Sequence, residues 1–147
     1  MIVEDLDTAS VGAEEQAWSM LKPLGAAAVP YLAEFYPRCR KWQGRASLVF
    51  HSVSYARVGE DAFQLGVAAL QDKATVVRYR ACSLLAYSQR TDALPFLRQL
   101  LSHSDNKTAV DAAAAIDAIT ARNHHLFVDR TRRGQTFWVV NEGDGEA

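Results

Sequence analysis

Two adjacent histidines, His124 and His125, are the residues best suited to chemistry in this chain, because imidazole binds metals and exchanges protons near neutral pH. Neighbouring side chains point in different directions, so the pair is a poor bidentate metal site. The nearest acid is Asp129, and no cysteine lies close by. We therefore expect no metal centre and no cofactor.

The two cysteines, Cys39 and Cys82, lie far apart in the sequence inside helical patterns and form no CxxC pair. We expect reduced thiols packed in or near the core. The sequence also lacks a glycine-rich phosphate loop, HExxH and GxSxG, the spacings that accompany common catalytic sites. It therefore predicts no catalytic residues and no enzyme.

A basic cluster with an aromatic residue inside it follows Pro37: Arg38, Arg40, Lys41, Trp42 and Arg45. Such a cluster is a possible nucleic-acid patch. The whole chain has a net charge of −1 and a pI near 6.4, so no general attraction draws it to polyanions. Nucleic acid is therefore the weaker expectation.

The length of 147 residues fits one domain, and a composition with 49% hydrophobic and 22% charged residues is that of a globular protein. No apolar stretch approaches the roughly 20 residues that span a bilayer. The first ten residues hold three acids and no basic residue, unlike a secretory signal. We expect a cytoplasmic protein without a membrane segment.

Apolar residues recur at helical spacing through most of the chain, as in the stripe Trp42, Ala46, Val49, Val53 and Ala56. Glycine, proline and capping residues mark the breaks between these stripes. The pattern predicts seven helices at about 10–24, 27–37, 41–57, 60–71, 74–89, 92–102 and 106–123. Because the connections are short, neighbouring helices should pack antiparallel.

After the last helix the pattern changes to one typical of strands. Leu126–Arg130 and Gln135–Val140 are rich in Phe, Val and Trp, and Gly134 between them can adopt a positive φ. We predict a β-hairpin that packs on the helices. The single domain then divides into a helical part (1–124), a hairpin cap (125–141) and a flexible acidic tail (142–147).

An internal repeat underlies the helical part. Gly44-Arg45, Val77-Arg78 and Val110-Asp111 recur at one constant interval, and Leu48, Ala81 and Ala114 align at the same interval. A fixed period of about 33 residues, with one helix pair per unit, is typical of a helical solenoid. We call this spacing the repeat interval.

The repeated residues resemble HEAT repeats. Asp72, Val77, Arg78 and Ala81 are followed by Ala93-Leu94-Pro95-Phe96-Leu97, and the earlier Ala28-Val29-Pro30-Tyr31-Leu32 echoes the second half. The resemblance covers roughly residues 17–120 and implies an all-α fold, a short right-handed HEAT-like or armadillo-like α-α solenoid. Asp111 departs from the pattern by replacing the arginine, and the expected hairpin is not part of a HEAT repeat.

The resemblance implies that Arg45 and Arg78 pair with acids of the adjacent unit, with surface recognition as the alternative. Tyr79 and Tyr87, about two turns apart on the helix of Arg78, either contact a partner or seal against a neighbouring helix pair, and the expected hairpin either caps the stack or binds a partner. The candidate binding residues are Arg45, Arg78, Tyr79, Arg80, Asp129, Arg130 and Trp138.

Short helical solenoids bind macromolecules on a curved face. We therefore expect a non-enzymatic protein–protein interaction module or adaptor, of the inhibitor or immunity type, with an unidentified protein partner. One alternative is a nucleic-acid binder similar to HEAT-like DNA glycosylases, which needs convergence of Arg38, Arg40, Lys41, Arg45, Arg78 and Arg80. Another is a lyase or chaperone for a prosthetic group. The sequence leaves the oligomeric state open.

Overall fold

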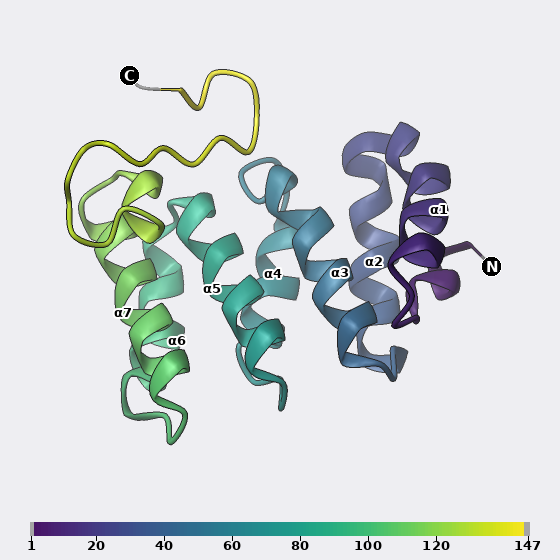
Figure 1. Cartoon of the computed structure of the whole chain (residues 1–147), viewed down its shortest axis with the longest axis horizontal. Helices are drawn as coiled ribbons and strands as arrows, with labels where there is room; N and C mark the ends of the chain where they lie inside the picture. The colour runs from purple at the N-terminus through teal and green to yellow at the C-terminus, as the bar shows by residue number, and fades with distance from the viewer. Residues whose placement is uncertain (1, 146–147) are drawn as a thin grey trace.

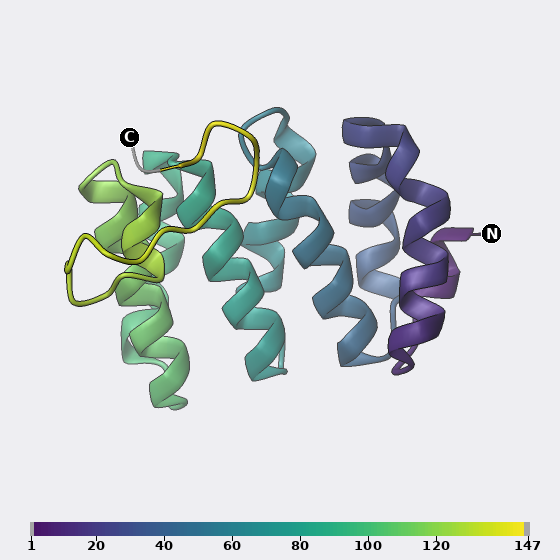
Figure 2. The same ribbon diagram turned by 45° about the horizontal axis from the view of Figure 1, so that its top comes forward.

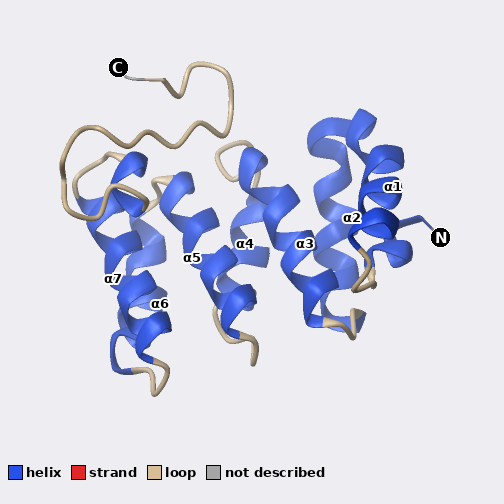
Figure 3. Cartoon of the chain, viewed as in Figure 1, coloured by secondary structure: helices blue, strands red, loops and turns tan. Residues whose placement is uncertain are grey.

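A computed structural model describes residues 2–145, and every regular element in this range is helical (Figures 1 and 3). The seven α-helices are α1 (Val11–Leu21), α2 (Val29–Phe35), α3 (Trp42–Ser52), α4 (Glu60–Ala69), α5 (Thr75–Ser88), α6 (Leu94–Gln99) and α7 (Asn106–Thr120). Short 3-10 helices flank them: η1 (Ile2–Leu6), η2 (Lys22–Ala28), η3 (Tyr36–Arg38), η4 (Val53–Tyr55), η5 (Thr91–Ala93), η6 (Leu100–Ser102) and η7 (His124–Phe127).

Each helix predicted from the sequence corresponds to an α-helix, in several cases extended by a 3-10 turn. The ends follow local chemistry. The Ser10 hydroxyl accepts the Ala13 N–H at the start of α1, and Pro30 lies in the first turn of α2, where its missing N–H costs little. The all-α prediction is thus confirmed, whereas η1 was not predicted.

The helices form two layers, with α1, α3, α5 and α7 in one and α2, α4 and α6 in the other (Figures 1 and 2). Within the first layer α5 contacts both α3 and α7, and within the second α2 contacts α4. Helix α5 is the most deeply packed, with Val77, Ala81 and Leu84 fully buried. Each helix therefore covers its neighbours in a row of helix pairs.

The predicted apolar stripe of α3 is correct except at its first member. Val49, Val53 and Ala56 are buried, but Trp42 is 44% exposed. Trp42 is the first residue of α3, and it lines a shallow hollow with Phe50 and Val76 on the surface shared by α3 and α5. Its placement in the core was wrong because the stripe was extended to the end of the helix, where neighbours no longer cover it.

Two arginines separated by one repeat interval join successive helix pairs in the same way. Arg45 Nε donates to the Asp72 carboxylate at 2.8 Å, and an Arg78 terminal nitrogen donates to the Asp105 carboxylate at 2.8 Å. Each guanidinium also donates to a carbonyl of the loop before its own helix, Arg40 O at 2.7 Å and Asp72 O at 2.8 Å. We call this pair of contacts the arginine ladder.

The ladder carboxylates also fix the backbone of their own loops. Asp72 accepts the Ala74 N–H at 2.9 Å, and Asp105 accepts the Lys107 N–H at 3.0 Å. The residue that precedes Asp72 by one repeat interval is Cys39, in the loop before α3. It carries no carboxylate.

Asp7 supplies the missing group at this first loop. Its carboxylate accepts the Arg40 and Lys41 N–H groups at 3.1 and 2.8 Å. The segment after η1 lies so close to α3 that a Cβ on Gly44 would be 2.7 Å from Leu6 O. The N-terminal segment therefore completes the first loop and requires glycine at position 44.

The predicted β-hairpin is wrong: residues 2–145 contain no strand. Leu126 and Phe127 belong to η7, and Gln135–Val139 has no regular structure. The segment 128–145, which we call the strap, leaves η7 and returns across the stack from α7 toward α3 (Figures 1 and 2). It ends its crossing where Asn141 Nδ2 donates to Ser54 O at 2.7 Å.

Side chains take the hydrogen bonds that a second strand would have taken. Asn123 caps η7 by accepting the His125 N–H, which turns the first predicted strand into a 3-10 helix. The Asp129 carboxylate accepts the Arg133 and Gly134 N–H groups at 3.1 and 2.8 Å and closes a loop. Gly134 has a positive φ of 72°, as expected, but it lies in a loop closed by the Asp129 side chain and not in a hairpin turn.

Candidate binding groove

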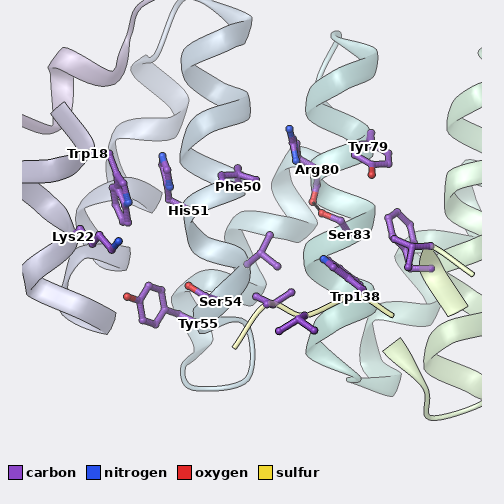
Figure 4. Close-up of a pocket in the computed structure, with 15 residues that line it drawn as sticks. Trp18, Lys22, Phe50, His51, Ser54, Tyr55, Tyr79, Arg80, Ser83 and Trp138 are labelled. Atoms are coloured by element: carbon purple, nitrogen blue, oxygen red, sulfur yellow. Dashed lines mark hydrogen bonds between the residues drawn. The ribbon is translucent and has the colours of Figure 1, made fainter. Parts of the chain in front are cut away.

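The surface between the first helix layer and the strap contains a groove of about 340 Å³ (Figure 4). Residues of α1, α3, η4, α5, η7 and the strap line it. Six aromatic side chains contribute to its wall: Trp18, Phe50, Tyr55, Tyr79, Phe127 and Trp138. Large rings supply apolar contact area at a low conformational cost, as binding surfaces require.

One end of the groove is built by a stacked pair from two helices. The rings of Trp18 and His51 are parallel within 8°, with centroids 3.9 Å apart, and they lie face to face (Figure 4). His51 Nε2 is also hydrogen-bonded to the Glu14 carboxylate. Burial lowers the pKa of His51, and this effect outweighs the opposing effect of Glu14. The pair joins α1 to α3 across the groove.

Arg80 provides the charge at the centre of the groove. Its guanidinium lies 4.6 Å from the centroid of the Phe50 ring, and the two side chains point toward each other (Figure 4). In residues 2–145 no carboxylate is ion-paired with Arg80. Lys22 adds a second cation, and the lining includes neither Asp nor Glu. The groove is therefore aromatic and electropositive.

Three of the seven candidate residues predicted from the sequence meet at this groove: Tyr79, Arg80 and Trp138. Tyr79 packs against Phe127 with ring centroids 5.7 Å apart, and Lys107 Nζ lies 4.9 Å from the Tyr79 ring centroid. Tyr79 thus both lines the surface and contacts its neighbours, the two alternatives that the sequence left open.

Arg45 and Arg78 lie elsewhere, in the arginine ladder, with exposed fractions of 8% and 6%. Because their guanidinium groups pair with Asp72 and Asp105, they do not join Arg80 on a common basic surface. The convergence of six cations that a nucleic-acid interface would need is therefore not formed.

Asp129 and Arg130 hold the start of the strap in place. Asp129 is 5% exposed and closes the loop at Gly134. Arg130 donates to Phe127 O at 2.7 Å and to the Asp111 carboxylate at 3.0 Å. Asp111, which replaces the repeated arginine, thereby binds an arginine of the strap.

Trp138 is held at the groove by the two histidines that first suggested chemistry. Its backbone N–H donates to His125 Nδ1 at 2.8 Å, and its carbonyl lies 2.8 Å from His124 Nε2. The Arg57 guanidinium donates to His124 Nδ1 at 3.2 Å, so the Nε2 atom must carry the proton that binds the carbonyl. Burial lowers the pKa of His124 and favours this neutral form.

The far end of the strap is fixed by Asp144, within the segment that the sequence assigned to a flexible tail. Its carboxylate accepts the Tyr87 hydroxyl at 2.6 Å and the Asn141 N–H at 2.8 Å. These bonds outweigh the effect of burial and lower the pKa of Asp144. Two anchors, at Trp138 and Asp144, therefore hold the strap over the first helix layer.

The sequence reasoning missed Trp18, Lys22, Phe50 and His51, although the repeat contained a signal for them. Trp18 and His51 are separated by one repeat interval. Phe50 and Ser83 are separated by the same interval, and all of these residues line the groove. The repeat interval aligned the ladder arginines. If it had also been applied to the exposed faces of α1, α3 and α5, it would have placed these groove residues on one surface.

Two arrangements typical of catalytic sites are not found among the described residues. No group of three or more His, Cys, Asp or Glu in residues 2–145 could hold a metal ion. No serine or cysteine of the same range is hydrogen-bonded to His51. Both cysteines are free and buried, as predicted, and burial raises the thiol pKa to about 12 for each, which suppresses the reactive thiolate.

Comparison with known proteins gives no relative from which a function could be carried over: the chain matches no protein-family model and no curated protein. Among the described residues, no helix is both long and apolar enough to span a bilayer.

Proposed function

We propose that this chain is a non-enzymatic protein-interaction module that holds an extended, acidic segment of a partner protein in the groove. The observation that carries the proposal is Arg80, which has no ion pair within residues 2–145 and stacks on an exposed phenylalanine at the centre of an aromatic wall. Arginine and aromatic side chains dominate the energetics of protein interfaces. Cytoplasmic residence and a role as adaptor or inhibitor belong to the same proposal.

The architecture supports this assignment. We interpret the row of helix pairs as a short HEAT-like solenoid, because the arginine ladder repeats at the interval found in the sequence. Stacked repeat units create continuous surfaces that bind elongated partners. Lys22 and Arg80 are the charged residues that line the groove here, which favours carboxylates in the bound segment.

Site-specific photocrosslinking tests the proposal. Benzoylphenylalanine is placed at Phe50, 50% exposed in the groove, or at Phe96, 39% exposed on α6 in the other helix layer. We expect a defined protein to crosslink at position 50 in a lysate of the source cells, and not at position 96. Adding Arg80→Gln to the position-50 variant should reduce the yield about tenfold.

The controls separate a specific site from a sticky surface. Both probes replace exposed phenylalanines, so similar crosslinked proteins at positions 50 and 96 would contradict a specific groove. Insensitivity of the position-50 crosslink to Arg80→Gln would contradict the role of the charge. Crosslinking of nucleic acid at position 50, strongly weakened by salt, would favour the alternative class of partner.

A further inference from the structure

The backbone of the strap between Phe137 and Val140 uses its hydrogen-bonding groups alternately. Trp138 turns both its N–H and its C=O toward the histidines of η7, and the next residue but one, Val140, donates its N–H to Asp144 at 3.1 Å. In an extended chain, the N–H and C=O of one residue point to the same side and those of its neighbours to the other. The strap is therefore bound to η7 on one edge at Trp138 and closed on itself at Val140, whereas Thr136 makes no hydrogen bond within residues 2–145.

The opposite edge is open. The backbone N–H and C=O groups of Gln135, Phe137 and Val139 make no hydrogen bond with any residue in 2–145. The residues that carry these groups are also accessible, since Phe137 is 42% and Val139 63% exposed. An unpaired row of N–H and C=O groups along an extended segment is a template for another strand.

The open edge borders the groove. Val139 lines the groove together with Trp138 and Val140, and the cations Lys22 and Arg80 line the same groove. In the close-up, Trp138 of the strap lies next to Ser83 of α5 (Figure 4). A strand placed along the strap would thus have main-chain partners on one side and the aromatic, electropositive wall of the groove beside it.

The strap is prepared for this contact before any partner arrives. The Trp138 ring packs edge-on against Tyr87 and lies beside Phe127, with centroid distances of 5.7 Å to each. The histidine contacts and Asp144 fix the backbone on either side of Val139. A fixed edge avoids much of the ordering cost that a free tail would add to binding.

We propose that the partner segment binds as a β-strand added to the open edge of residues 135–139, with its carboxylates directed at Arg80 and Lys22. This inference rests on the proposed function and specifies its binding mode. Main-chain pairing would supply affinity, and the groove wall would select apolar and acidic side chains. The occupant we infer is therefore an extended acidic segment of another protein.

Backbone chemistry at Val139 tests the proposal in the full chain. A synthetic segment 134–147 is ligated to expressed residues 1–133, with the Val139 amide either N-methylated or replaced by an ester. Both changes remove an N–H that has no partner in residues 2–145. N-methylation keeps the Trp138 carbonyl as an amide acceptor for His124, whereas the ester weakens this acceptor, so the N-methyl variant is the decisive one. The matched control is N-methylation at Glu142, whose N–H also has no partner among the described residues but lies beyond the open edge.

The probe is the tightest-binding synthetic 12-residue peptide selected from a random library on the unmodified chain. We expect both Val139 changes to weaken its binding about tenfold, the loss of one main-chain hydrogen bond, with the Glu142 control unchanged. The bound peptide, labelled with ¹³C at its carbonyls, should also show the infrared amide shift of a paired strand.

The outcomes separate the two proposals. If Arg80→Gln weakens peptide binding and the Val139 changes do not, the groove function stands and strand addition is overturned. If no selected peptide responds to either change, or none is selected, both proposals fall. If the Val139 changes instead dissolve a dimer seen by sedimentation velocity, the edge belongs to a second copy of this chain, and the partner we infer is wrong.

Discussion

The arginine ladder and the strap are held in opposite ways. In the ladder, Arg45 and Arg78 make the same kinds of contact one repeat interval apart, with nearly buried charges that satisfy each other. In the strap, Trp138 is held by two histidines and Asp144 by the Tyr87 hydroxyl and two N–H groups, contacts that occur once in the described residues and do not repeat. We therefore expect the stack to depend more on the ladder than on the strap.

The largest difference should come from removing a ladder carboxylate. Asp72→Ala leaves the Arg45 guanidinium nearly buried without its partner and also removes an acceptor for the Tyr36 hydroxyl. We expect the free energy of unfolding to fall by about 3–5 kcal/mol. Urea denaturation provides the measurement. As a control, Asp117→Ala removes an exposed pair with Arg132 and should cost less than about 1 kcal/mol; equal effects would contradict a special role for the ladder.

The close approach at the first loop offers a smaller perturbation without a change of charge. Gly44→Ala places a methyl group 2.7 Å from both Leu6 O and Cys39 Sγ, so the N-terminal segment must shift. We expect a loss of about 1–3 kcal/mol in urea denaturation. Gly12→Ala, in α1 with nothing within 4 Å of the new methyl, should be neutral or stabilising by up to about 1 kcal/mol. Equal losses in the two variants would show that the segment is not tightly packed.

A matched tyrosine pair tests the strap. Tyr87→Phe removes the hydroxyl that binds Asp144 and should lower stability by about 1 kcal/mol. Amide hydrogen exchange should quicken in residues 138–144, while the ladder loops keep their protection. Tyr79→Phe serves as the control, because that hydroxyl makes no hydrogen bond in the described residues. Faster exchange in the ladder loops as well would show that the two regions unfold together.

The smallest effect should be that of pH on the free energy of unfolding, through His124, which binds the strap. Burial lowers the folded pKa of His124 below its usual 6.5, so the unfolded chain binds more protons as the pH falls below about 6.5. Stability is therefore greatest above this pH and declines below it, until His124 also titrates in the folded protein. Protonation would also break the bond that His124 Nδ1 accepts from Arg57.

Urea denaturation from pH 7.5 to 5.5 measures this decline. His124→Gln, which can still donate to the Trp138 carbonyl, should reduce it. Burial also lowers the pKa of His51, so part of the decline should remain in the variant. An unchanged profile in His124→Gln would remove His124 as a cause.

The regular half of the molecule was predictable and the strap was not, for a physical reason. Helices follow from local periodicity, and the repeat placed Arg45 and Arg78 in equivalent positions, with the HEAT resemblance implying acidic partners. In the strap, the strand-like composition of Gln135–Val140 wrongly predicted a strand paired within the chain. The hydrogen-bonding partners of this segment are the side chains of His124 and His125, and no periodic pattern in the sequence predicts such contacts.

The candidate site divides in the same way. Tyr79, Arg80 and Trp138 were expected to bind and do line the groove, whereas Trp18 and His51 needed the repeat to be applied to exposed faces as well as buried ones. Trp42 shows the converse error, an apolar residue assigned to the core from spacing alone. Periodicity defines a helix face, but which neighbour covers its ends depends on distant segments.

The ladder also implies a route by which such a protein could grow in evolution. Residues 72–104 begin with Asp72 and contain Thr75 and Arg78, and the following block begins with Asp105 and contains Thr108, the residues that Arg78 binds. A tandem duplication of residues 72–104 would give the new Arg78 its own aspartate and threonine at the correct distance along the chain. Lengthening by whole blocks would leave no charge unmatched at the joint, so the surface that we propose for binding could be extended by one genetic event.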